Sequence, residues 1–88
     1  MVVISSETDS CQICEQILQE AARNLQKDYA ENELLKELLL ACNSLEATYD
    51  RETVQKCIGF TYPNIDIIYN DFKAGKDAHS TCVEIGQC

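Results

Sequence analysis

The chain has 88 residues, of which 45% are hydrophobic and 25% are charged. Its 15 acidic and seven basic side chains give a formal net charge of -8 at pH 7, which argues against nucleic acid because affinity for phosphates depends on Lys and Arg. No run of apolar residues in the sequence is long enough to cross a membrane as a helix.

Six cysteines in so short a chain are typical of small secreted domains whose cores need covalent support. One domain of this size buries about 60 to 65% of its unfolded surface, and each disulfide adds about 2–4 kcal/mol, mainly by restricting the unfolded chain. We expect a flexible lead-in at residues 1–10 and a disulfide-bonded domain at residues 11–88. Met1 to Ile4 is too short for a secretory signal, so we expect that a longer one was removed.

The first predicted element is a long amphipathic helix over roughly residues 10–28. Asp9 stands three residues before Gln12, a spacing that resembles an N-cap with its capping-box partner. Cys11 and Cys14, three residues apart, share one face of the first turn. Apolar residues then recur at helical spacing along one stripe: Ile13, Ile17, Leu18, Ala21, Ala22, Leu25 and Tyr29.

A second helix follows a charged break at residues 28–33, with Asn32 as the expected cap. Its apolar residues cover more than one face, which indicates burial on several sides or a second apolar surface for a partner. Residues 43–49 are predicted to form a connection that keeps some helix. The apolar residues of this helix are Leu34, Leu35, Leu38, Leu39, Leu40, Ala41, Cys42 and Leu45.

Asp50 is the expected cap of a third helix that begins near Arg51. Pro63 removes a backbone donor, so we expect a kink or break at residues 59–63. Gly75 suits a helix end, and Asp77 suits the cap of a short last helix over residues 78–85. No alternating pattern long enough for a strand occurs, and the sequence therefore predicts an all-α domain with four to five amphipathic helices.

The cysteine spacing resembles that of saposin-like domains. A Cys11-x2-Cys14 pair is followed, after gaps of 27, 14 and 24 residues, by Cys42, Cys57 and a final Cys82-x5-Cys88 pair. The spacing alone permits fifteen pairings, and the resemblance implies one of them. The implied bonds are Cys11 with Cys88, Cys14 with Cys82, and Cys42 with Cys57. The implied fold is a leaf of helices held by these bonds, either closed or opened into a V-shape.

The family binds lipids or disturbs membranes, so the resemblance implies an apolar lipid-binding surface. Gly59 and Pro63 are the candidate hinge, with a static kink as the alternative. Phe60 and Ile67 fall off the main stripe and have no obvious core neighbour. Together with Leu40 they are surplus apolar positions, which favour contact with lipid or with a second copy of the chain in a homodimer. The alternative for every stripe residue is an ordinary closed core. The candidate lipid-binding residues are Ile17, Leu18, Ala21, Leu25, Leu35, Leu38, Leu39, Ile58, Tyr62, Ile65, Ile68 and Phe72.

The acidic charge favours one branch of this family. Cytolytic members are commonly cationic, whereas this chain is similar to the lysosomal saposins that present lipids at low pH. Acid discharges carboxylates and so reduces repulsion from anionic lipid. We expect a protein that is secreted or resides in the lumen of a lysosome or other acidic vesicle. A membrane-permeabilising defence protein, pore-forming or fusogenic, and a secreted interaction or antigen module without lipid handling are the alternatives.

The sequence offers no catalytic set and no cofactor motif. It contains neither a plausible Cys-His or Ser-His-Asp arrangement nor a glycine-rich phosphate loop. A zinc site from the Cys11–Cys14 pair with His79 and Cys82 would leave the other cysteines unexplained, so disulfides are preferred. We expect no enzyme activity, no metal and no cofactor, and we expect His79 to be an exposed polar residue.

Overall fold

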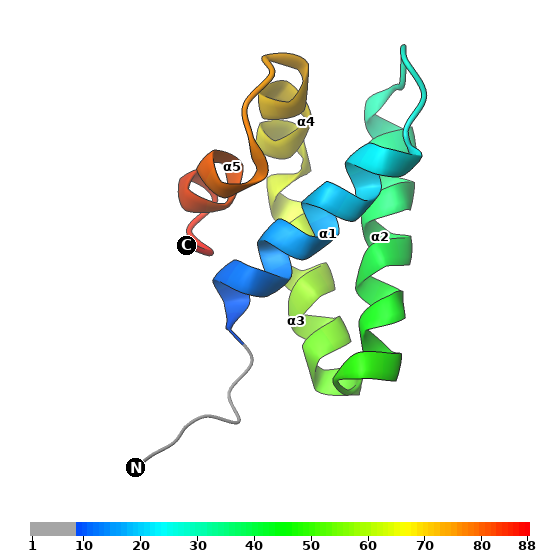
Figure 1. Cartoon of the computed structure of the whole chain (residues 1–88), viewed down its shortest axis with the longest axis vertical. Helices are drawn as coiled ribbons and strands as arrows, with labels where there is room; N and C mark the ends of the chain where they lie inside the picture. The colour runs from blue at the N-terminus through cyan, green and yellow to red at the C-terminus, as the bar shows by residue number, and fades with distance from the viewer. Residues whose placement is uncertain (1–8) are drawn as a thin grey trace.

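The computed structural model describes residues 9–88 and folds them into five α-helices and one 3-10 turn (Figure 1). No strand occurs among these residues, so the predicted all-α class is confirmed. Residues 1–8, which make up most of the predicted lead-in, lie outside the described part. The elements are α1 (Ser10–Asn24), α2 (Glu31–Thr48), α3 (Arg51–Thr61), η1 (Tyr62–Asn64), α4 (Ile65–Lys73) and α5 (Ala78–Glu84).

Helix α1 begins as predicted and ends earlier than predicted. The Asp9 side chain accepts a hydrogen bond from the backbone N–H of Cys11 (3.1 Å). The helix stops at Asn24 rather than near residue 28, because Leu25 adopts an extended conformation (φ -89°, ψ 145°). Residues 26–28 are polar and exposed and have no apolar side chain to hold a further turn. Leu25 and Tyr29 still pack against the core, now from a loop.

Helix α2 begins one residue before Asn32, so the predicted cap is wrong. Ala30 occupies the cap position, and its backbone N–H donates to Glu33 Oε1 (2.8 Å). The carboxylate of Glu33 therefore satisfies a backbone donor without a capping side chain. Beyond residue 43, where a connection was predicted, the helix continues to Thr48, because Leu45 is buried in the core and anchors this part.

Helix α3 is capped by Asp50, which accepts hydrogen bonds from the backbone N–H (2.8 Å) and hydroxyl (2.7 Å) of Thr53. The predicted break is present as η1, which contains Pro63. Gly75 takes a left-handed conformation (φ 81°) after α4, where a glycine carries no Cβ penalty. Asp77 then caps α5 by accepting from the Ser80 N–H (2.8 Å).

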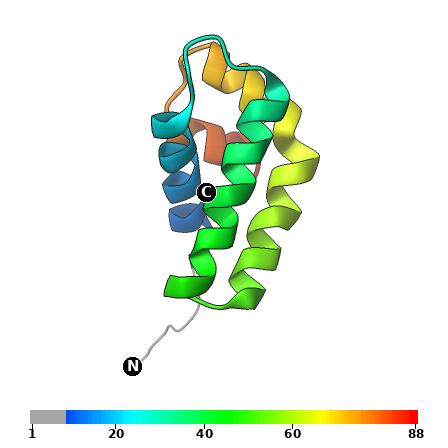
Figure 2. The ribbon, with the colours of Figure 1, turned by 90° about the vertical axis from the view of Figure 1, so that its right-hand side faces the viewer.

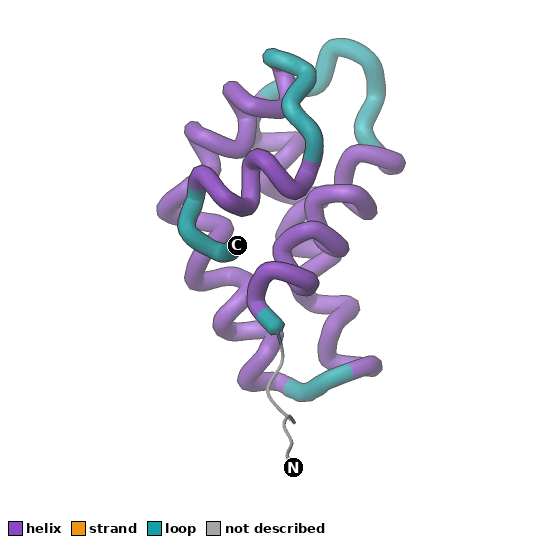
Figure 3. Tube along the Cα trace, turned by 60° about the vertical axis from the view of Figure 1, so that its left-hand side comes forward, coloured by secondary structure: helices purple, strands orange, loops and turns teal. Residues whose placement is uncertain are grey.

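The helices share one continuous core, and the fold is the closed form of the predicted leaf. Helix α1 crosses in front of α2 and α3, which run side by side, and α5 lies against the first half of α1 (Figures 1 and 2). The α1–α2 and α4–α5 connections lie at one end of the molecule and the α2–α3 connection at the other (Figure 3). The large buried core side chains include Ile17, Leu18, Leu34, Leu38, Leu45 and Ile68.

Three disulfides join the helices in pairs, in the pairing that the resemblance implies. Cys14–Cys82 links α1 to α5, and Cys11–Cys88 links α1 to the turn after α5. Cys42–Cys57 links α2 to α3. These three bonds use all six cysteines of the sequence. Within residues 9–88 no disulfide therefore connects the α1–α5 pair to the α2–α3 pair.

Candidate functional site

The twelve candidate lipid-binding residues do not form one surface in the closed fold. Five are fully buried and form part of the core: Ile17, Leu18, Ala21, Leu38 and Ile68. Six are half-buried: Leu25, Leu35, Leu39, Ile58, Ile65 and Phe72. Tyr62 is exposed (54%). In this state the buried five match the alternative interpretation, an ordinary closed core.

The buried core residues meet at a seam between the two cross-linked pairs. From α1 the seam receives the stripe of Ile17, Leu18 and Ala21, and from α2 it receives Leu34 and Leu38. Apart from the disulfides, which lie within the pairs, this contact between α1 and α2 is apolar. Hydrophobic contact of this kind has no directional requirement, so a lipid chain is a chemically suitable replacement for either side.

A groove of about 440 Å³ opens beside the seam, between α1 with the connection that follows it and α4 with the α4–α5 connection. It shares Leu18 with the seam. We call it the end groove. Its apolar lining includes Leu18, Leu25, Tyr29, Phe72 and Ala78, and its polar lining includes Lys27, Lys76 and Asp77. Two of the candidate residues thus reach the surface here beside basic side chains, an arrangement that suits an acyl chain with an anionic headgroup.

The Tyr29 ring forms one wall of the end groove and is held by two contacts. It meets the Tyr69 ring edge to face, with centroids 5.9 Å apart. Lys73 Nζ lies 4.0 Å from the Tyr29 ring centroid, a cation–π contact. Lys73 is therefore a further basic group at this end of an otherwise acidic molecule.

A second apolar surface is formed by α2 together with the first residue of α4. It consists of Leu35, Leu39, Leu40 and Ile65, and we call it the outer face. Two shallow hollows of about 450 and 310 Å³ adjoin there and share Leu35 and Asn32. Leu40 is 54% exposed, in keeping with its prediction as a surplus apolar position.

Phe60 and Ile67 differ from the prediction that they lack core neighbours. Phe60 is only 9% exposed and belongs to the core, and Ile67 is half-buried against it. Phe60 lines a second groove of about 320 Å³ with Ile13 from α1 and Gln87 from the chain end. Helix α3 is therefore buried on the side that faces α2 and also at this groove. Its buried surface is wider than the single apolar stripe seen in the sequence.

A buried carboxyl was not recognised from the sequence. Asp71 on α4 is 6% exposed, and its Oδ2 has no hydrogen-bond partner among the described residues. Burial raises the pKa of Asp71, and the neighbouring carboxyl of Glu84 raises it further against the opposing charge of Lys76. The neighbouring Asp71 carboxyl and the ammonium group of Lys76 lower the pKa of Glu84. The pair therefore favours a proton on Asp71.

The candidate hinge residues lie on the α3–α4 side. Gly59 is exposed in α3, and nothing lies within 4 Å of the position that a Cβ would take there. Pro63 is exposed in η1. The Asn64 side chain donates to the Phe60 carbonyl (2.8 Å), and the Thr61 hydroxyl donates to the Cys57 carbonyl (2.8 Å). Side chains thus satisfy backbone acceptors on both sides of the break.

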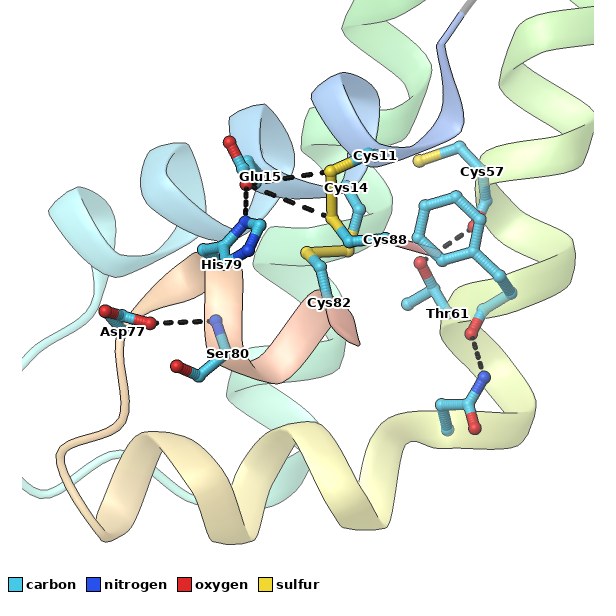
Figure 4. The surroundings of a disulfide bond; sticks show 12 residues. Cys11, Cys14, Glu15, Cys57, Thr61, Asp77, His79, Ser80, Cys82 and Cys88 are labelled. Carbon is cyan, nitrogen blue, oxygen red and sulfur yellow. Dashed lines mark hydrogen bonds and ion pairs between the residues drawn. A yellow bond between two sulfur atoms is a disulfide. The ribbon is translucent and has the colours of Figure 1, made fainter. Parts of the chain in front are cut away.

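The single histidine is exposed, with 65% of its side chain accessible, but it has a specific neighbour. His79 Nδ1 lies 2.5 Å from Glu15 Oε2, which joins α5 to α1 beside the Cys11–Cys88 disulfide (Figure 4). Asp77, its near neighbour in sequence, caps Ser80 instead. The zinc site considered from the sequence would use Cys11, Cys14, His79 and Cys82. All three of these cysteines form disulfide bonds in the structure.

A scan against models of protein families, a search of curated proteins and a search of solved structures found no match to this chain. Among the described residues, no helix combines the length and the apolar character that a membrane crossing requires.

Proposed function

We propose that this chain is a saposin-like domain that binds lipids at membrane surfaces, either as a secreted protein or in the lumen of an acidic vesicle such as the lysosome. One observation carries the proposal: the apolar seam between the α1–α5 pair and the α2–α3 pair is crossed by no disulfide within residues 9–88. Because each pair is cross-linked internally, separation at the seam leaves both pairs intact.

Separation requires movement at only two connections, residues 25–30 and the region from Gly59 to Pro63 that includes the start of η1. Opening exposes the seam residues, which in water costs about 25 cal/mol for each Å² of apolar surface. Acyl chains that cover the same surface recover this free energy, so lipid stabilises the open form. The end groove, where Leu25 and Phe72 are already half-buried, is the expected entry point.

The net charge and the pKa shifts of several carboxyl groups support stronger lipid binding at acidic pH. Lowering the pH reduces the charge of -8 and hence the repulsion from anionic lipid. The neighbouring Asp66 raises the pKa of Glu31, and burial raises the pKa of Asp71, so these two groups take up protons early. Hydrogen bonds from Thr53 lower the pKa of Asp50, and one from Ser80 lowers that of Asp77. The caps of α3 and α5 therefore persist while the surface loses charge.

The experiment is co-sedimentation with anionic and neutral liposomes at neutral pH and at about pH 4.5, with release of an encapsulated dye measured in the same samples. We expect binding to anionic liposomes in acid with little dye release. Hydrogen exchange then reports the mechanism, because opening at the seam should increase exchange in α1 while the cross-linked pairs remain folded. Binding without any change in α1 would contradict opening.

Two other outcomes lead to different functions. Binding with rapid dye release would favour the membrane-permeabilising alternative. No binding under any condition would contradict lipid handling and favour a secreted interaction module. The outer face gives a separate reason to measure oligomeric state, since pairing of two copies through Leu35, Leu39 and Leu40 would cover exposed apolar surface.

A further inference from the structure

Four side chains that suit a metal ion converge beside the most accessible disulfide. Cys11 and Glu15 stand four residues apart on α1, His79 lies in the first turn of α5, and Cys88 follows α5 (Figure 4). Glu15 Oε2 is 3.7 Å from Cys11 Sγ, 3.9 Å from Cys88 Sγ and 2.5 Å from His79 Nδ1. All four ligand atoms lie within 4.8 Å of one another.

In the oxidised protein this cluster lacks two of its ligands, because disulfide sulfurs are not the thiolates that metals bind. Reduction would supply two thiolates beside an imidazole and a carboxylate, which is a four-ligand set that tetrahedral Zn²⁺ accepts. We propose that reduction of Cys11–Cys88 by a dithiol creates a zinc site from Cys11, Glu15, His79 and Cys88. This inference is independent of lipid binding.

Accessibility selects this disulfide for reduction. Cys88 is exposed and Cys11 is half-buried, whereas Cys14, Cys82, Cys42 and Cys57 are fully buried. An incoming thiolate must reach a sulfur atom to attack it, so the Cys11–Cys88 bond reacts first.

The chemistry of the proposed step is balanced. One thiolate of the dithiol attacks a sulfur of the Cys11–Cys88 bond and forms a mixed disulfide. The second thiol of the reductant then displaces the protein thiol, so the dithiol becomes a disulfide and Cys11 and Cys88 gain two electrons and two protons. Zn²⁺ subsequently displaces the two thiol protons as it binds.

The scaffold of the site does not depend on the bond that is reduced. Cys14 lies one helical turn after Cys11 on α1, and Cys82 lies within α5, so the Cys14–Cys82 bond continues to hold α1 against α5. The backbone N–H groups of Gln87 (2.8 Å) and Cys88 (3.1 Å) both donate to the Cys82 carbonyl. The cap formed by Asp77 fixes the turn that carries His79. The ligands thus stay close after reduction, and the exposed His79 ring has room to rotate toward a metal.

The test uses the full chain after limited reduction with dithiothreitol. Alkylation and peptide mass mapping should find free thiols at Cys11 and Cys88, while circular dichroism stays helical. After removal of the reductant without air, native mass spectrometry should count one Zn²⁺ per chain, and Co²⁺ should give the thiolate charge-transfer and tetrahedral d–d bands. The oxidised protein should bind neither metal at the same concentration.

Variants separate the proposed site from simple binding to two thiols. His79→Ala and Glu15→Gln should each weaken Zn²⁺ binding by about tenfold or more, whereas Glu20→Gln on the same helix should leave it unchanged. The double variant Cys11→Ser with Cys88→Ser keeps Glu15 and His79 and should bind no Zn²⁺. Equal affinity in the His79 and Glu15 variants, or reduction of Cys14–Cys82 together with Cys11–Cys88, would overturn the proposal.

Discussion

Asp71 on α4 and Glu84 on α5 share a single cation, the ammonium group of Lys76. Lys76 Nζ lies 3.6 Å from Asp71 Oδ1 and 3.0 Å from Glu84 Oε1. One positive charge is thus placed between two carboxyl groups, of which Asp71 is buried and has an unpartnered oxygen. This arrangement makes the contact between α4 and α5 sensitive to pH.

The variant Asp71→Asn should raise the melting temperature at neutral pH. The pKa of Asp71 is raised by burial and by Glu84, so the folded state binds a proton more readily than the unfolded state, and the charged form costs stability above the raised pKa. Asn resembles the protonated carboxyl and removes this cost. The gain should disappear as the pH falls through the raised pKa, where the wild-type group is itself protonated. Thermal unfolding of Asp28→Asn, an exposed loop variant, serves as the control.

The cap of α3 should show the opposite dependence on pH. Hydrogen bonds from Thr53 lower the pKa of Asp50, so its contribution is present at neutral pH and is lost as the pH falls through the folded-state pKa. Asp50→Ala should therefore lower the melting temperature at neutral pH and make little difference in strong acid. Asp50→Asn keeps a capping oxygen without titration and should retain most of the stability at both pH values. Equal losses for the two variants would contradict a capping role.

Two leucines two residues apart on α2 should differ sharply in their contribution to stability. Leu38 is fully buried, and Leu38→Ala should cost about 2–5 kcal/mol of unfolding free energy through lost burial and an unfilled cavity. Leu40 is 54% exposed, and Leu40→Ala should change stability by no more than about 0.5 kcal/mol. Urea unfolding of both variants gives the comparison directly.

Substitutions in the end groove and on the outer face should have different effects on lipid binding. If acyl chains enter at the end groove, Leu25→Ser should weaken liposome binding in acid by about tenfold or more, which corresponds to the loss of one buried leucine. Leu40→Ser on the outer face should then bind like the wild type. The reverse ranking would place the lipid on the outer face. Melting temperatures must show that both variants are folded under the assay conditions.

Local sequence signals predicted much of the fold. Asp9, Asp50 and Asp77 lie at helix starts with side-chain acceptors, and Pro63 lies at the break between α3 and α4. Such signals act over three or four residues and need no tertiary information. The cap predicted at Asn32 is wrong because the helix starts at Glu31, after the cap residue Ala30, whose backbone N–H donates to the Glu33 carboxylate.

The features that the sequence did not reveal depend on contacts between distant segments. Phe60 is buried and lines a groove with Ile13 from α1 and Gln87 from the chain end, neighbours that a single helical stripe cannot show. Asp71 on α4 is buried on the side that faces α5, although its residue type predicts exposure. Glu15 and His79 are 64 positions apart, and their meeting depends on how α1 and α5 are joined. The spacing of amino acids shows which face of a helix is apolar. It does not show which other helix packs against that face.

The nested Cys11–Cys88 and Cys14–Cys82 bonds also determine what a protease can do to this molecule. Residues 26–28 form an exposed connection after α1, a typical place for proteolytic nicking. A cut there would produce two polypeptides that stay covalently joined, because both bonds tie α1 to the end of the chain. The nicked product would migrate as one species until it is reduced. It would also have lost one of the two backbone links between its halves, so limited digestion is a way to obtain a form that opens more easily.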